Sequence, residues 1–327
     1  MQTRILGSVL IVLTVLGGVR LFSHMKADNH FSGADDVVVN TAYESSSDAE
    51  VMIKKSFSAS NLRALVIDVA HADIVIETGM VKEATVRVEL QSRNMSRAKE
   101  RFEEMDWEVH DGNGSLYVSA ESPRGNWNLS MDINVFITIP EKFDLDLKTS
   151  HGDVDLEKLN GMAVIATSHG DVNFQTIEGK NVEIRSSHGD ITGQMLSSDT
   201  VTIETSHADI QMEEVQSKRM TASTSHSDIS IRYLTGDSMI STSHGDITLF
   251  VAGKEQVDLE TQHGNIDLKV DGAIGSDLDL RAESVRVDRS LSVKGETSRK
   301  RVDGAVNGGG RLIKARTTHG SIAIDTK

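Results

Sequence analysis

The sequence predicts an all-β protein: a single-stranded β-solenoid (β-helix) with coils of 18–19 residues and an N-terminal β-rich cap segment. One observation is a histidine motif, exemplified by RSSHGDI at Arg185 to Ile191, that recurs at a nearly constant interval. Another is the apolar, β-branched residue that follows each of these histidines by three positions. The third is a composition with 4% aromatics, 26 Gly, 2 Pro and no Cys, which favours many short strands and turns over a helical bundle.

Residues 1–23 are typical of a signal peptide or an N-terminal membrane anchor. A basic start, MQTR, precedes the apolar run from Ile5 to Val19, which has the length of a signal-peptide core and is shorter than the roughly 20 residues that span a bilayer. No small-x-small cleavage pattern follows at Ser23 or Ala27, so a retained anchor stays open. The segment predicts an extracytoplasmic protein of the periplasm or cell envelope, in contact with the membrane only through this segment if it is not cleaved.

Two segments precede the repeats. Residues 24–56 are acidic and serine-rich with little periodicity, which predicts a flexible linker. Residues 57–140 form the predicted N-terminal β-rich cap segment, because stretches such as ATVRVEL, SLYVSA and INVFITIP alternate with the period of two that strands require. One helix is expected in SRAKERFEEM, with Ser96 as its N-cap.

The histidine spacing predicts a solenoid over residues 141–327. Successive gaps are 18, 19, 19, 19, 18 and 19 residues, and a last histidine follows 56 residues later, about three periods. Each coil supplies only a few apolar residues, so like residues are expected to stack at about 4.8 Å per coil and to form one continuous core. The histidines are His151, His169, His188, His207, His226, His244, His263 and His319, and the residues three positions later are Val154, Val172, Ile191, Ile210, Ile229, Ile247, Ile266 and Ile322.

The residues around each histidine predict a repeated turn. A glycine follows it in most coils, with Ala208 and Ser227 in its place twice, which suggests a left-handed backbone conformation. A Thr or Ser two positions earlier shares the parity of the inward row and predicts a ladder of hydroxyls bonded to one another. Segments at LRAESVRVD and near TSRKRVD read as coils without the motif, and the first keeps its apolar spacing if Ala282 takes the histidine position. This favours histidine as an outward turn residue.

An aspartate row accompanies the histidines, and carboxylates about 4.8 Å apart repel each other by roughly 1 kcal/mol even in water. Backbone N–H donors of the same turn, cationic imidazoles or a bridging metal ion would offset this repulsion. The two rows predict a candidate array for Zn, Ni or Cu, although ligands on separate coils imply no closed tetrahedral set. No other cofactor is expected. The candidate ligands are His169, His188, His207, His226, His244, His263, Asp171, Asp190, Asp209, Asp228 and Asp246.

Three features carry a resemblance to a known family: VFITIPEKFDLDLKTSHGDVDLEKLNG at the centre, the repeated Thr-x-x-Gly-Asp-Ile coils, and VNGGGRLIKARTTHGSIAI near the C-terminus. Together they resemble the bacterial DUF4097 family of adhesin-like β-strand repeat proteins, related to the head GIN domain proteins, over about Phe57 to Lys327. The resemblance implies a right-handed β-solenoid with an adhesin-like role and without catalytic residues. This chain departs from the family by using His where Ser or Asn is commoner.

The expected function is that of a non-enzymatic, exported, adhesin-like envelope protein that presents a repetitive surface to an envelope or surface polymer or protein. A divalent-metal-binding or pH-responsive ladder is the alternative. A glycan-cleaving β-helix enzyme is less favoured, because it needs an irregular carboxylate cluster, and the sequence has no GxSxG, P-loop or HExxH motif. The net charge of −15 argues against nucleic-acid binding. Residues 281–316 are an exception, because they contain 10 Lys and Arg against 4 Asp and Glu. This basic segment is interpreted as a solvated edge, with a contact for anionic polymers as the alternative.

Overall fold

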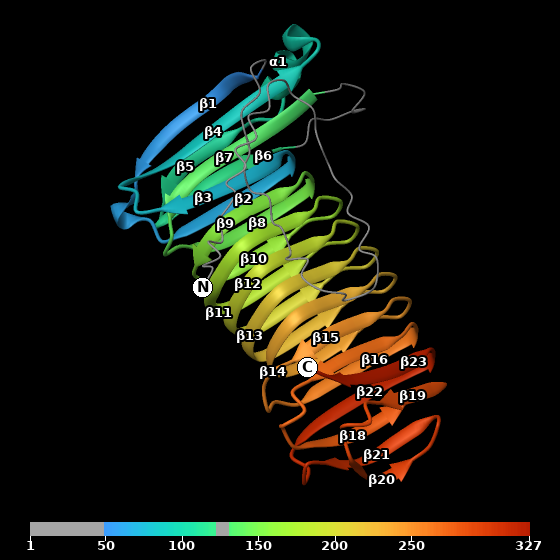
Figure 1. Cartoon of the computed structure of the whole chain (residues 1–327). Coiled ribbons are helices and arrows are strands. Elements are labelled where there is room, and N and C mark those ends of the chain that lie inside the picture. The colour runs from blue at the N-terminus through green and yellow to red at the C-terminus, as the bar shows by residue number, and fades with distance from the viewer. Residues whose placement is uncertain (1–48, 122–130) are drawn as a thin grey trace, which may run out of the picture.

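The computed structural model describes residues 49–121 and 131–327, which form an elongated stack of β-coils (Figure 1). The leader predicted at 1–23, and the predicted linker as far as residue 48, lie outside the described residues. Within the described ranges, no helix has the length and hydropathy needed to cross a membrane. The stack confirms the predicted all-β solenoid with one helix, and its handedness stays a prediction.

Each coil has two faces and passes from the first to the second through the histidine turn. Equivalent strands of neighbouring coils pair in parallel, with like residues in register, as Val172 with Val154 on the second face and Ile184 with Ile165 on the first. The first face comprises β2 (Ala64–His71), β8 (Asp144–His151), β10 (Ala163–Ala166), β16 (Val257–His263), β22 (Arg311–His319) and β18 (Ser276–Arg281). The second comprises β3 (Asp73–Gly79), β9 (Val154–Asn160), β15 (Ile247–Val251), β17 (Ile266–Val270), β23 (Ser321–Thr326) and β19 (Ser284–Val287), while β11 (Val172–Arg185), β12 (Ile191–Glu204), β13 (Ile210–Ser223) and β14 (Ile229–Ser241) belong to both.

The core consists of stacked inward residues, as the sequence predicts. Val172, Ile191 and Ile210 pair in direct register in three successive coils and are buried, because the coils on either side cover each side chain. One layer departs from this like-on-like packing. Phe174 lies opposite Gly193, and its ring fills the space that a side chain at position 193 would need. Most inward rows of the core therefore stack side chains of similar size, whereas this row pairs a large side chain with a glycine.

The first coil of the solenoid lies inside the segment predicted as cap. β2 and β3 flank His71-Ala72-Asp73 and pair in register with β8 and β9, so that Leu65 is opposite Leu145 and His71 is opposite His151. The chain leaves this coil, forms the rest of the cap, and returns as β8. The 57–140 segment is therefore one solenoid coil together with an insertion that covers it.

That insertion closes the N-terminal end of the stack (Figure 1). Strands β6 and β7 continue β2 and β3 in parallel, and β7, β4 and β1 then pair antiparallel, so the repeat ends there. β1 begins within the predicted linker, since this largely exposed edge strand lacks the alternation of a half-buried one. The helix is capped by Asn94, whose Oδ1 accepts the Arg97 N–H at 3.3 Å, and not by Ser96. The elements are β1 (Glu50–Ser58), η1 (Ala59–Asn61), β4 (Glu83–Ser92), α1 (Met95–Glu103), β5 (Glu108–Gly112), β6 (Ser115–Ala120) and β7 (Met131–Pro140).

The C-terminal coil lies between two coils that precede it in the sequence. β22 pairs with β16 on one side and β18 on the other, and β23 lies between β17 and β19 in the same way. His319 is therefore the direct neighbour of His263 in the stack, and not three periods away. The order of coils gives ten layers between the two ends of the solenoid.

The segment near TSRKRVD, predicted as a coil, is a hairpin. β20 (Val293–Thr297) and β21 (Arg301–Val306) pair antiparallel, and β21 also pairs antiparallel with β18. The two strands are connected by a tight turn, in which the Ser298 N–H donates to the Arg301 carbonyl at 2.8 Å. The chain reverses at this turn, so the segment is too short to form a coil of its own. The hairpin covers the C-terminal end of the solenoid.

Candidate functional site

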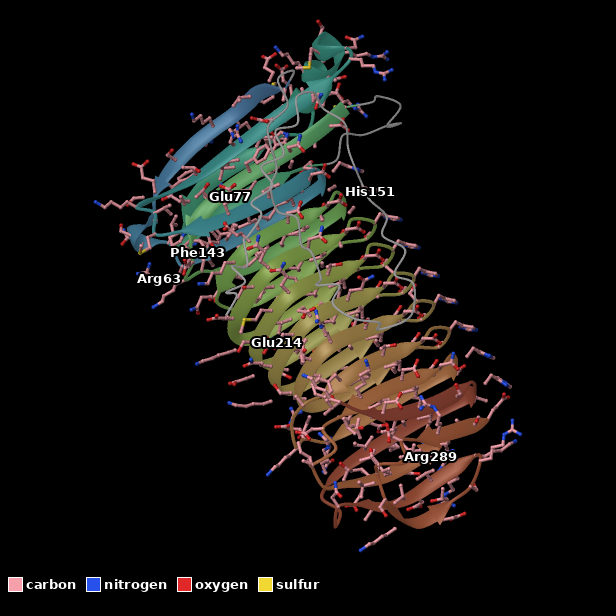
Figure 2. All side chains as sticks on the ribbon, in the orientation of Figure 1. Arg63, Glu77, Phe143, His151, Glu214 and Arg289 are labelled. Atoms are coloured by element: carbon pink, nitrogen blue, oxygen red, sulfur yellow. The ribbon has the colours of Figure 1, made fainter. Side chains whose placement is uncertain are left out.

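Imidazole rings form a continuous stack along the edge where the first face turns into the second. Ring centroids of neighbours lie 4.6–5.1 Å apart, and the ring planes differ by 2–18°. Figure 2 shows His151 on this edge. The rings are exposed except for His71, which is half-buried. This imidazole row consists of His71, His151, His169, His188, His207, His226, His244, His263 and His319.

Backbone hydrogen bonds between coils place the rings. The His169 N–H donates to the Ser150 carbonyl of the preceding coil at 3.0 Å, and the equivalent bond recurs up to His263 with lengths of 2.9–3.1 Å. Each side chain therefore leaves the backbone at the same point of its coil, one strand spacing from the next, and the planar rings stack. From His151 to His263, the imidazoles make no side-chain hydrogen bond or ion pair within the described part of the chain, whereas His319 Nδ1 lies 3.4 Å from Glu283 Oε1.

The aspartate row is held by bonds across coils. The Asp190 N–H donates to Asp171 Oδ1 at 2.8 Å, and the Asp209 N–H donates to Asp190 Oδ1 at 2.9 Å. The donors lie in the next coil, whereas the sequence-based hypothesis placed them in the same turn as the carboxylate. Each carboxylate thus accepts a backbone N–H of the next coil, which offsets its repulsion from its neighbours. Equivalent bonds of 2.6–3.1 Å connect Asp73, Asp153, Asp171, Asp190, Asp209, Asp228, Asp246, Asn265 and Ser321.

The Thr and Ser side chains before the histidines are buried, as predicted, and six of the eight bind the backbone instead of one another. The hydroxyls of Thr149 and Thr205 have no hydrogen-bond partner among the described residues. Ser186 Oγ accepts the Gly189 N–H of its own turn at 2.8 Å. Further along, Thr261 Oγ1 donates to the Gly245 carbonyl of the previous coil at 3.0 Å. Either bond serves a backbone group of the turn that would otherwise be buried without a partner. The buried residues are Thr149, Thr167, Ser186, Thr205, Thr224, Thr242, Thr261 and Thr317.

The glycine after the histidine is explained by close contact and not by a left-handed backbone, which corrects the sequence-based expectation. Gly152 alone in this row has a positive φ, 158°, and the other glycines that follow the histidines have a negative φ. A Cβ at Gly189 would overlap the carbonyl group of Gly170 in the preceding coil. Ala208 continues the row in the next coil, so a single methyl is accommodated there by local adjustment. The turn therefore selects for small residues.

Sequence reasoning missed the first members of both rows, His71 and Asp73. The available signal was AHADIVI, which matches SHADIQM around His207, but eighty residues separate His71 from the next member of the row. Burial, together with the charge of His151, lowers the pKa of His71 below its usual value. Protonation of the imidazole row is therefore disfavoured at His71, its half-buried end. The pH-responsive role of the row stays a prediction.

The predicted metal ligands lie in these two rows without converging. All six candidate histidines are consecutive members of the imidazole row, and all five candidate aspartates are consecutive members of the aspartate row. In residues 49–121 and 131–327, no three His, Asp or Glu side chains are grouped so that they could hold one metal ion. Metal binding by the array stays a prediction.

Five of the ten Lys and Arg side chains in the basic segment at 281–316 form ion pairs with carboxylates. Arg286 forms a bidentate pair with Asp325 at 2.8 and 2.9 Å, and Asp279 pairs with both Arg281 and Arg316 at 3.1 Å. This pairing supports the interpretation as a solvated edge. A surface pocket lies here, beside the end of the imidazole row, and is lined by Arg281, Ala282, Glu283, Lys300, Arg301, Thr317 and Thr318.

The buried carboxyl group of Asp155 makes the stability of the folded protein depend on pH. Its carboxylate is buried and accepts a hydrogen bond from Asn173 Nδ2 at 3.1 Å. Burial, with smaller contributions from the charges of Asp153, Asp73 and Asp171, raises the pKa of Asp155 to about 6. The folded state therefore binds a proton more tightly than the unfolded state does, so this group's stabilisation is present near pH 4 and is lost as the pH rises through about 6.

We expect Asp155→Asn to raise the free energy of unfolding by about 1–2 kcal/mol at pH 7.5, where the wild-type carboxylate is charged and buried. The amide keeps an oxygen for Asn173. The gain should shrink as the pH falls to 4.5, where the wild-type carboxyl is mostly neutral. Urea unfolding of both proteins at the two pH values measures this, and an equal gain at both would contradict it.

One family model and several solved structures match the chain. The family model for Toastrack DUF4097 matches residues 62–325. A solved structure of a "putative adhesin" from Parabacteroides distasonis is 13% identical, with a TM-score of 0.43, and covers 85% of this chain and 98% of its own. A "putative adhesin" from Bacteroides fragilis is also 13% identical, with a TM-score of 0.43 and coverages of 86% and 98%. A "putative lipid binding protein" from Parabacteroides distasonis is 11% identical, with a TM-score of 0.37 and coverages of 85% and 98%. No curated protein matches the chain.

Proposed function

Since the chain belongs to the Toastrack DUF4097 family, we propose that it is a non-enzymatic, exported, adhesin-like protein that uses its imidazole row as a binding surface for an envelope or surface polymer or protein. The observation that carries the proposal is the row itself: exposed rings at a repeat of 4.6–5.1 Å along one edge.

The histidine side chain is the one part of the turn that the fold does not use. Backbone pairing, the aspartate carboxylate and the Thr or Ser hydroxyl provide the hydrogen bonds between coils, and glycine provides the close contact. The tenth coil, β18–β19, stacks with Ala282 in place of the histidine. A side chain that the fold can omit, yet that is present in the other nine coils, is best explained by an outward role.

The regularity of the edge supports a binding role over a catalytic one. Seven successive coils, from His71 to His244, present the same imidazole and carboxylate in the same arrangement, whereas glycan cleavage needs two carboxyl groups at one defined place. An array of equal groups at one repeat distance suits a partner that is itself repetitive, because many weak contacts then add through multivalency.

Cosedimentation with purified bacterial cell-wall sacculi tests the proposal. We expect the wild-type protein to bind and the His169→Asn, His188→Asn, His207→Asn, His226→Asn, His244→Asn variant to bind at least tenfold more weakly, with an unchanged circular dichroism spectrum. A control variant, Arg299→Gln with Lys300→Gln, removes two cations of the basic segment and should bind as the wild type does. Equal binding by the histidine variant would contradict the proposal, as would release of soluble glycan that a single substitution abolishes.

A further inference from the structure

The imidazole row has ring nitrogens that are free to bind a ligand. From His151 to His263 the rings contact each other by stacking and make no side-chain hydrogen bond or ion pair to the described residues. The neighbouring groups of the turn are already engaged, because the carboxylates accept N–H groups of the next coil. Neutral imidazole is a ligand of choice for Zn, Ni and Cu.

The stacking geometry relates each ring nitrogen to the same nitrogen of the next coil. Between His169 and His188 the centroids are 4.9 Å apart and the planes differ by 2°, so equivalent nitrogens are separated by nearly the centroid distance. Two nitrogens on one tetrahedral metal ion, at bonds of about 2.1 Å, lie about 3.4 Å apart. Each nitrogen must therefore move about 0.7 Å towards its partner, and each ring must turn out of the stack, because the lone pair that binds the metal lies in the ring plane. The rings are exposed and their terminal torsion is broad, so they have the freedom to turn.

The charge of the edge favours a cation as the ligand. The aspartate row runs two residues after the imidazole row and carries one carboxylate per coil from Asp73 to Asp246. The whole chain has a net charge of −15. An approaching divalent cation is attracted to this edge, whereas a polyanion is repelled by it.

We propose that the edge binds divalent transition-metal ions, each bridged by the imidazoles of two successive coils, with water or a partner's ligands completing the coordination. Nine rings form at most four separate pairs, so the row binds up to four ions. The inference rests on the proposed function, since it takes the same edge as the binding surface and names its ligand.

Two variants with equal histidine content separate bridged sites from independent ones. The alternating variant changes His151, His188, His226 and His263 to Asn and leaves no two neighbouring imidazoles in the row. The contiguous variant changes His169, His188, His207 and His226 to Asn. It leaves the neighbours His71 and His151 at one end, and His244, His263 and His319 at the other.

Isothermal titration with Ni²⁺ at pH 7.5, checked by elemental analysis after dialysis, measures the stoichiometry of each protein. We expect about four ions for the wild type, two for the contiguous variant and none for the alternating variant. Equal stoichiometry in the two variants would overturn the bridging geometry, and the absence of binding in the wild type would overturn the proposal. Paramagnetic shifts of the wild-type histidine ring protons on adding Ni²⁺ give a readout that does not depend on how the variants fold.

The sacculus assay repeated with a chelator distinguishes this inference from the proposed function. Binding to sacculi that persists in chelator, together with no Ni²⁺ stoichiometry, removes the metal inference and leaves the binding surface. Four Ni²⁺ per chain without any sacculus binding supports the metal sites and contradicts the adhesin-like role.

Discussion

Phe174→Ala is expected to destabilise the protein by about 3–5 kcal/mol, the largest effect of any single substitution considered. The ring is fully buried, and it occupies the space above Gly193 in the next coil. Neighbouring side chains cannot refill that space, because position 193 has none to offer. Chemical unfolding followed by circular dichroism measures the loss, and Phe174→Leu, which keeps most of the volume, should cost less than half as much.

The same contact predicts a compensating pair. Gly193→Ala alone places its methyl group on the ring of Phe174 and should cost about 1–3 kcal/mol through overpacking. Combined with Phe174→Leu, the methyl group fills part of the vacated space, so the double variant should be at least 1 kcal/mol more stable than the sum of the single effects. Additive costs would show that the two positions are not coupled across the coils.

Asp190→Ala is expected to cost about 1–3 kcal/mol, the second of the large effects. The alanine leaves the Asp209 N–H, held between two coils, without its acceptor Oδ1 at 2.9 Å. Asp190→Asn is the matched control, since it keeps the acceptor oxygen and removes one charge from a row of like charges. Asn265 already occupies this position in a later coil, where it accepts the Ser321 N–H at 3.0 Å.

Burial raises the pKa of Asp209, and the charges of Asp190 and Asp228 raise it further, whereas the hydrogen bond from the Asp228 N–H lowers it; the net direction is upward. Removing a neighbouring charge relieves that repulsion, so Asp190→Asn should be as stable as the wild type or more stable at pH 7.5. Urea midpoints of the two variants provide the comparison. If both variants lose the same stability, the carboxylate would act by its charge and not as the acceptor between coils.

The spacing of the histidines predicted the coil length and the inward row, because a repeated structure repeats its sequence. The same spacing could not reveal the order of the last coils. His319 shares its register with His263, and any position in the stack that keeps the histidine and Ile322 in their rows satisfies the same pattern. Pairing of β22 with β16 and β18 is decided by tertiary contacts between segments far apart in the chain.

The sequence was sufficient to predict the histidine row and the aspartate row, but not the hydrogen bonds and close contacts that connect neighbouring coils. Residue types and parity place the histidines outward and Thr261 inward. The N–H donor that bonds to the Asp190 carboxylate could not be inferred, since N–H groups of its own turn and of the next coil are equally plausible in a sequence. The glycine was assigned to backbone conformation because its real constraint, the carbonyl of Gly170, belongs to the preceding coil.

The inserted C-terminal coil has a consequence for the order of folding. β16–β17 and β18–β19 are synthesised before β22–β23, which joins them, so growth of the stack from the N-terminus stops at β17 until the last strands are available. Proteolytic loss of residues 311–327 would also leave unpaired edges on both of these coils. Open edges of this kind are templates for association with other chains. β22 and β23 therefore decide whether the edges of β16–β17 and β18–β19 are paired or left open to other chains.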